Sequence, residues 1–186
     1  ASLSGRRSKP VNRQRHHMAH AYIPYGIYWS PPFAKWQGTI ANLNSLRLAA
    51  VCGRHALKDR AFPMERVDLG ILGITNIQHG SFYGLPWVTG MMGIDNVTGP
   101  TVQQACATSA RVLQMAAQEV VGGSAACALI VTADRCSNGP VVHYPDATAP
   151  GGAGHLERWV LDNFAHDPYA NNAMITTAEN VATRYG

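Results

Sequence analysis

The sequence predicts an α/β fold, in which helices pack on the faces of a sheet. Short apolar runs alternate along the chain with longer segments whose apolar residues recur at helical spacing. Glycines and helix-capping residues separate these segments. Of the 186 residues, 46% are hydrophobic and only 14% are charged. This balance indicates a large buried core, or apolar surface that faces a partner chain.

The strands are expected where apolar and β-branched residues cluster in short runs. An edge strand is expected at 21–29, because this run is aromatic and β-branched but contains Pro24. Buried strands are expected at 67–75 and 126–132, which are almost wholly apolar. A short strand is expected at 101–105.

The first helix is expected to run to about Arg60 from a cap at Asn44 or Ser45. Helical spacing places one set of side chains on its core face: Leu48, Cys52, His55 and Ala56. A second helix, at 85–92, is closed by Gly93.

A third helix is expected from Cys106 to Val121, with Gly122 and Gly123 to stop it. It is apolar over most of its circumference, and only a narrow stripe is polar: Arg111, Gln114 and Gln118. Such a pattern predicts a buried helix.

The chain changes character after the last predicted strand. Prolines, glycines and histidines are frequent from Asp134 to Asn172, which predicts loops and short helices that leave the main sheet. Residues 176–179 (TTAE) then match a capping box, and a final helix is expected to follow and to end at Gly186.

Charge does not point to a nucleic-acid partner. The net charge is +4, but five basic residues lie in the first 17 positions, which contain no acid: Arg6, Arg7, Lys9, Arg13 and Arg15. Residues 1–17 are therefore expected to be a disordered basic arm or an artificial leader. No run approaches the ~20 apolar residues of a membrane span, and the four cysteines show no metal-site spacing. We expect no metal, and a reduced, cytoplasmic compartment.

The strongest chemical signal is Cys106, at the junction between a predicted strand and a predicted helix. The free N–H groups at a helix start favour an anionic sulfur and can stabilise an oxyanion. The small neighbours Ala105 and Ala107 leave room for a substrate. A small buried cysteine at the start of a core helix fits the same residues, so the pattern alone leaves both interpretations open.

Three stretches resemble the thiolase superfamily. Residues 101–135 are similar to its nucleophile region, residues 32–57 (PFAKWQGTIANLNSLRLAAVCGRHAL) to its opening, and residues 173–186 (AMITTAENVATRYG) to a segment of its loop domain. The resemblance implies a thiolase-like N-terminal domain, with helices layered on a mixed sheet, at 18–135. It also implies the start of a substrate-covering loop domain at 136–186, so that the fold is incomplete on this chain.

The resemblance assigns roles to particular residues. Cys106 would be the catalytic nucleophile that takes the acyl group from one CoA thioester and passes it to a second substrate. The N–H groups of Cys106 and Ala107 would form the oxyanion hole, and Met174 would lie beside the substrate. CoA thioesters are the substrates, and no further cofactor is implied. Family members are oligomers, so a homo-oligomer is expected in the cytoplasm, with an organelle matrix as the alternative.

The sequence also departs from the family pattern. The GHP histidine motif and the CxG cysteine motif are missing, so a second chain or segment is expected to supply them. Ala173 stands where many thiolases have histidine, and VTADRCSN stands where many have an acidic GGxExM run. Two alternatives remain: a β-ketoacyl synthase-type condensing enzyme, which shares the CATS wording at Cys106, and a non-catalytic thiolase-fold scaffold or binding subunit.

Overall fold

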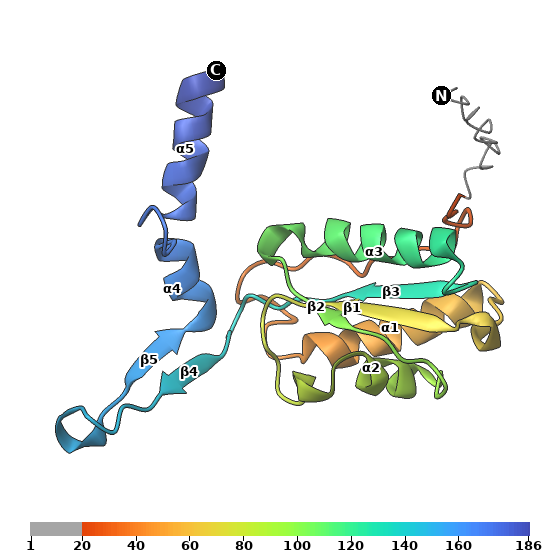
Figure 1. Ribbon diagram of the computed structural model, residues 1–186, viewed down its shortest axis with the longest axis horizontal. Coiled ribbons are helices and arrows are strands. Elements are labelled where there is room, and N and C mark those ends of the chain that lie inside the picture. Colours follow the sequence, from red (N-terminus) through yellow and green to blue (C-terminus); the bar gives the residue numbers. More distant parts are fainter. Residues whose placement is uncertain (1–19) are drawn as a thin grey trace, which may run out of the picture.

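The main body of the protein is a three-layer α/β domain, from which the C-terminal segments project as an arm (Figure 1). The computed structural model describes residues 20–186. The basic arm predicted at 1–17 lies outside the described residues. The α/β fold class predicted from the sequence is confirmed.

The central sheet has the strand order β2-β1-β3, and both pairings are parallel. The middle strand is β1 (Leu69–Gly73), flanked by β2 (Thr101–Val102) and β3 (Ala128–Thr132). Because helices cover both faces, β1 is apolar and largely buried on both sides. In the described residues, antiparallel pairing occurs in a separate hairpin. A mixed sheet was expected, and the central sheet is instead parallel throughout these residues.

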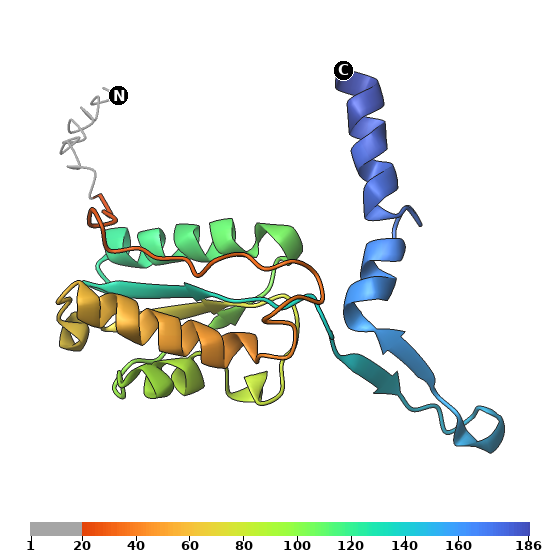
Figure 2. The ribbon, with the colours of Figure 1, turned by 180° about the vertical axis from the view of Figure 1, so that it is seen from behind.

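Two helices cover one face of the sheet (Figures 1 and 2). The helix α1 (Ser45–Asp59) begins where the side chain of Asn44 accepts two backbone N–H groups, which confirms the predicted cap. The helix α2 (Gly84–Met92) ends at Gly93 in the left-handed conformation that glycine adopts readily. Two short 3₁₀ turns, η1 (Met64–Arg66) and η2 (Ser81–Tyr83), precede β1 and α2.

The predicted core face of α1 is correct for Ala56, which is buried, and wrong for its other three members. His55 is exposed, and Leu48 and Cys52 are only half-buried. The buried side of the helix is formed by Ser45, Leu46, Ala50, Gly53, Ala56 and Leu57. Gly53 allows this close packing, since a Cβ there would lie 2.7 Å from the Cε of Met92.

The helix α3 (Thr108–Gly122) covers the opposite face of the sheet. It packs with Val112 and Ala116 against Ile71 of β1, and Gly123 ends it in the left-handed conformation, as predicted. The expectation of a buried helix is wrong for the described residues. Only one side of α3 contacts the sheet, and Leu113 and Val121 remain 43% and 45% exposed.

The edge strand predicted at 21–29 is not formed. A turn closes from the N–H of Ile27 to the carbonyl of Pro24 (3.0 Å), and the segment continues without strand pairing. A β-strand needs a hydrogen-bonded neighbour. In the described residues β3 pairs with β1 along one edge only, and no strand pairs with its other edge.

The arm begins with an antiparallel hairpin of β4 (Val141–Tyr144) and β5 (His155–Arg158), closed over the 3₁₀ turn η4 (Pro150–Gly152). It continues into α4 (Trp159–Ala165). The sequence predicted loops and short helices here, so the hairpin was missed. Prolines and glycines in its connection concealed the strand pattern.

The last helix, α5 (Met174–Tyr185), begins earlier than predicted. Ala173 is its N-cap and provides no side-chain hydrogen bond. The predicted capping box at 176–179 is therefore wrong, because these residues lie inside the helix, where Thr177 Oγ1 donates to the carbonyl of Ala173 at 3.4 Å. No residue of α5 is buried in the described structure.

Asp68, just before β1, ties that strand to the start of β3. Its carboxylate accepts the backbone N–H groups of Ala126 (2.8 Å) and Cys127 (3.0 Å). These bonds, that of Ala126 foremost, lower the pKa of Asp68. A carboxylate with a lowered pKa stabilises the fold above its unfolded-state pKa of about 3.9, and that stabilisation is lost as the pH falls through the folded-state pKa.

We predict that Asp68→Asn reduces the free energy of unfolding at pH 7, by less than about 1 kcal/mol because the carboxylate is exposed to solvent. The difference from the unmodified protein should shrink as the pH is lowered towards 3. Urea unfolding at both pH values measures it. Asp95→Asn is the control, since the Asp95 carboxylate accepts no hydrogen bond within residues 20–186. Equal destabilisation by Asp68→Asn at the two pH values would contradict the prediction.

Candidate active site

The candidate site lies at the edge where the parallel strands of the sheet end. Thr75 follows β1, Gln103 to Cys106 follow β2, and Asp134 follows β3. Since the carboxyl ends of parallel strands meet at one edge, the fold brings these residues together. Ligand sites of open α/β sheets form at this edge.

Cys106 lies in the connection between β2 and α3, in the 3₁₀ turn η3 (Ala105–Ala107). The predicted strand-to-helix junction is therefore present, although α3 itself begins at Thr108, two residues after the predicted start. Ala105 has a φ of 43°, a left-handed conformation that is unfavourable for a residue with a Cβ. This sharp turn presents Cys106 at the surface, where it is exposed in the described structure.

Two threonine hydroxyls hold the turn that contains Cys106. Oγ1 of Thr108 accepts the N–H of Gln104 at 2.7 Å and donates to the carbonyl of Ala105 at 2.7 Å. Oγ1 of Thr75 donates to the same carbonyl at 3.2 Å and lies 3.3 Å from Oγ1 of Thr108. The two residues before Cys106, Gln104 and Ala105, are thus fixed from the end of β1 and from the first turn of α3.

Thr75 is in turn held on both sides of its peptide backbone. Its N–H donates to the Asp134 carboxylate at 2.8 Å, and the N–H of Asn76 donates to the same oxygen at 2.7 Å. Its carbonyl accepts Nε2 of Gln103 at 3.3 Å and Nε1 of Trp159 at 2.9 Å. The segments that follow the three strands therefore meet in a single network around Thr75.

The two N–H groups predicted for an oxyanion hole differ in this structure. The N–H of Ala107 donates to the carbonyl of Gln104 at 3.0 Å, so it is already used within the turn. The N–H of Cys106 donates no hydrogen bond among residues 20–186. Cys106 thus combines an exposed thiol with an available backbone donor.

Met174, the predicted substrate-binding residue, is the first residue of α5 and is 45% exposed. In Figures 1 and 2, α5 stands away from α3 and from the sheet. The described chain therefore does not bring Met174 to Cys106. An open apolar hollow occurs on another part of the surface, between residues 31–40 and the α1 residues Leu48 and Cys52, and no residue of the Cys106 turn lines it.

Within residues 20–186, no three His, Cys, Asp or Glu side chains are grouped so that they could hold a metal ion. In the same residues, no helix has the length and apolar character that crossing a bilayer requires.

Sequence reasoning missed Thr75, Gln103, Thr108, Asp134 and Trp159. A partial signal existed for the strand ends, because Thr75 and Gln103 are polar residues within the runs predicted as strands and Asp134 lies two residues after the strand predicted at 126–132. Trp159 had no such signal. It is 84 residues from Thr75 in the chain, and only the folded arm brings its indole to the strand end.

Comparison with known proteins identifies the family of this chain. The family "Thiolase, N-terminal domain" matches residues 30–186. Among curated proteins, none matches the chain.

Solved thiolase structures share the fold. The acetyl-CoA acetyltransferase of Syntrophomonas wolfei aligns with a TM-score of 0.69 and 24% identity over 83% of this chain, and that of Bacillus anthracis with a TM-score of 0.66 and 22% identity over 81%. The Acat5 thiolase of Ascaris suum, solved in complex with coenzyme A, aligns with a TM-score of 0.65 and 19% identity over 81%.

The alignments cover 38% of the Bacillus anthracis chain and 39% of each of the other two. This chain thus spans about two fifths of the length of these structures. The family match extends over most of the chain and includes the strand, turn and helix around Cys106. We conclude that this chain belongs to the thiolase family and contains its N-terminal domain.

Proposed function

We propose that this chain supplies the nucleophile of a thiolase-type acyltransferase, and that Cys106 is that nucleophile. The observation that carries the proposal is the position of Cys106 in a strained strand-to-helix turn of a thiolase N-terminal domain. Thr75 and Thr108 fix the carbonyl of Ala105 directly before it. A nucleophile held this way needs little reorganisation to reach a substrate.

The proposed reaction has two acyl transfers. The Cys106 thiolate attacks the carbonyl carbon of a CoA thioester, and collapse of the tetrahedral intermediate forms a new thioester at Cys106 and expels the CoA thiolate, which takes up a proton. The acyl group then passes to a second substrate. In condensation the second substrate is the enolate of an acetyl-CoA, which attacks the Cys106 thioester and expels the Cys106 thiolate. In thiolysis the Cys106 thiolate instead attacks the 3-keto carbon of a 3-ketoacyl-CoA, the C2–C3 bond breaks, and acetyl-CoA leaves as an enolate that takes up a proton. A CoA thiolate then takes the acyl group from Cys106 and releases the Cys106 thiolate. The free N–H of Cys106 would stabilise the oxyanion in both transfers.

The remaining catalytic groups would come from outside these residues. The proposal requires a histidine in a GHP motif and a cysteine in a CxG motif, from a second segment or a second chain, to move the protons. The exposed surfaces of two helices support contact with such a second segment or chain. The helix α5 has no buried residue, and one side of α3 exposes Leu113 and Val121. Apolar surface that is contiguous typically faces a partner, and α5 alone exposes Met174, Ile175, Val181 and Tyr185.

A thiolase is favoured over a β-ketoacyl synthase by the family match and by the three similar structures, all of which are named as thiolases or acetyl-CoA acetyltransferases. CoA as substrate is supported by the CoA complex of the Ascaris suum thiolase. The homo-oligomeric state and the location in the cytoplasm or an organelle matrix remain predictions.

We predict that iodoacetamide labels Cys106 at least tenfold faster than Cys136 in the full protein, and that acetyl-CoA slows only the labelling of Cys106. Both sulfurs belong to exposed residues, so exposure alone would not separate them. Peptide mapping by mass spectrometry after timed labelling measures both rates.

Cys106→Ser provides the matching functional test, with Cys136→Ser as its control. Incubation with acetyl-CoA should leave an acetyl thioester on the unmodified protein and on Cys136→Ser, but not on Cys106→Ser. If the two sulfurs are labelled equally fast and acetyl-CoA protects neither, Cys106 is not the nucleophile, and the scaffold alternative gains support.

We further predict that Thr108→Val slows acylation of Cys106 by about tenfold, which corresponds to a loss of ~1.4 kcal/mol. The substitution removes the acceptor of the Gln104 N–H and a donor to the Ala105 carbonyl while keeping the side-chain shape. Single-turnover acylation by acetyl-CoA measures the effect.

Thr89→Val is the matched control, because Thr89 is also buried but its hydroxyl donates only within α2, to Leu85 and Pro86. Thr89→Val should leave the acylation rate within about twofold of the unmodified rate. Similar rate losses in both variants would mean that Thr108 contributes general stability and does not hold the turn.

A further inference from the structure

The arm reaches the candidate site through one tryptophan. Trp159 is the first residue of α4, and its indole N–H donates to the carbonyl of Thr75 at 2.9 Å. Thr75 is the residue whose hydroxyl holds the carbonyl of Ala105, next to Cys106. A continuous chain of contacts therefore leads from the arm to the nucleophile turn.

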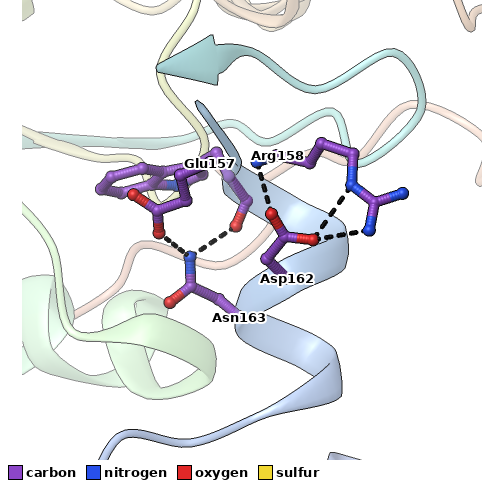
Figure 3. Close-up of polar contacts among 5 residues, drawn as sticks. Glu157, Arg158, Asp162 and Asn163 are labelled. Carbon is purple, nitrogen blue, oxygen red and sulfur yellow. Dashed lines mark hydrogen bonds and ion pairs between the residues drawn. The ribbon is translucent and has the colours of Figure 1, made fainter. Parts of the chain in front are cut away.

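The arm fixes where the indole lies. In Figure 3, Arg158 and Asp162 form an ion pair at 2.8 Å, and Asp162 also accepts the N–H of Arg158 at 2.7 Å. Asn163 donates to the carboxylate of Glu157 and, at 2.8 Å, to the backbone carbonyl of Trp159. These contacts bind the end of β5 to the first turn of α4 and place Trp159 between them.

The root of the arm is tightly packed as well. The N–H of Trp159 donates to the carbonyl of Pro140 at 3.0 Å. Val160 is only 6% exposed, and a Cβ at Gly139 would lie 2.6 Å from its Cγ2. The backbone of Trp159 therefore cannot shift relative to the hairpin without disturbing several contacts, so the hydrogen bond from its indole to Thr75 links the arm to the sheet.

At the edge of the sheet, hydrogen bonds restrict how the backbone of Thr75 can move. Its carbonyl accepts only two side-chain donors among residues 20–186, Gln103 and Trp159. Gln103 lies in the same loop as Cys106, at the longer distance of 3.3 Å. The hydrogen bond from Trp159 is the contact by which the arm orients this peptide.

We propose that Trp159 is a positioning residue for Cys106, which acts through Thr75 and makes the orientation of the nucleophile turn depend on the position of the arm. This inference rests on the proposed function, since it assigns regulation to the same site. When the arm is docked, the carbonyl and the hydroxyl of Thr75 are both held and the turn has one arrangement. When the arm moves away, the carbonyl of Thr75 loses the hydrogen bond from Trp159, and the turn that contains Cys106 can adopt more than one arrangement.

Trp159→Phe tests the proposal in the full protein, because it removes the indole N–H and keeps an aromatic ring. We expect the rate of Cys106 acylation by acetyl-CoA to fall about tenfold, equivalent to ~1.4 kcal/mol, with KM changed by less than about twofold. Labelling of Cys106 by iodoacetamide, relative to Cys136, should fall in the same variant.

Trp29→Phe is the control. Trp29 is half-buried like Trp159 and loses the same ring volume, but its indole N–H has no acceptor among the described residues. Its variant should keep the unmodified acylation rate. A double-mutant cycle with Thr75→Val adds a test of the route, because two substitutions that interrupt one chain of contacts are not additive.

Three outcomes are informative. If Cys106→Ser still forms an acyl-enzyme, the proposed function fails. If Cys106→Ser is inactive but Trp159→Phe acylates as fast as Trp29→Phe, the proposed function stands and the role of Trp159 is wrong. If Trp159→Phe is slow but its effect adds fully to that of Thr75→Val, Trp159 does not act through Thr75, and the inference is overturned.

Discussion

The site depends on how closely α3 can approach β1, and Gly73 sets that distance. A Cβ at this position would lie 2.8 Å from Cγ2 of Thr108 and 3.3 Å from Cγ1 of Val112. Such contacts are too short for the helix to keep its place. Because Gly73 has no side chain, the first turn of α3 lies directly over the end of β1, where the hydroxyls of Thr108 and Thr75 converge on the carbonyl of Ala105.

The central α/β layers could be predicted from sequence because their signals are local. Asn44 capped α1, Gly93 and Gly123 ended α2 and α3, and the apolar runs became β1 and β3. The failures involve partners that lie elsewhere. Residues 21–29 have strand-forming composition but no strand beside them, and the pattern of β4 and β5 was interrupted by their proline- and glycine-rich connection.

The candidate site, like the fold, has one part that could be predicted from the sequence and another that could not. The turn at Cys106 was predicted from three neighbouring features: a short predicted strand, small residues beside the cysteine, and an apolar helix after it. Its supports were not predicted, because the carbonyl of Thr75 meets Trp159 only after the arm has folded. Met174 was transferred from the family pattern, and the described chain, about two fifths of the length of similar structures, does not bring it near Cys106.

The left-handed conformation of Ala105 also has an evolutionary consequence. A residue with a Cβ at a φ of 43° costs of order 1 kcal/mol, which glycine would avoid. Glycine would also widen the range of orientations open to the following sulfur. Selection for thermal robustness alone would therefore favour glycine at position 105, whereas selection for a fast first step would retain a side chain there. An alanine at this position therefore costs some folding stability and narrows the orientations open to the sulfur.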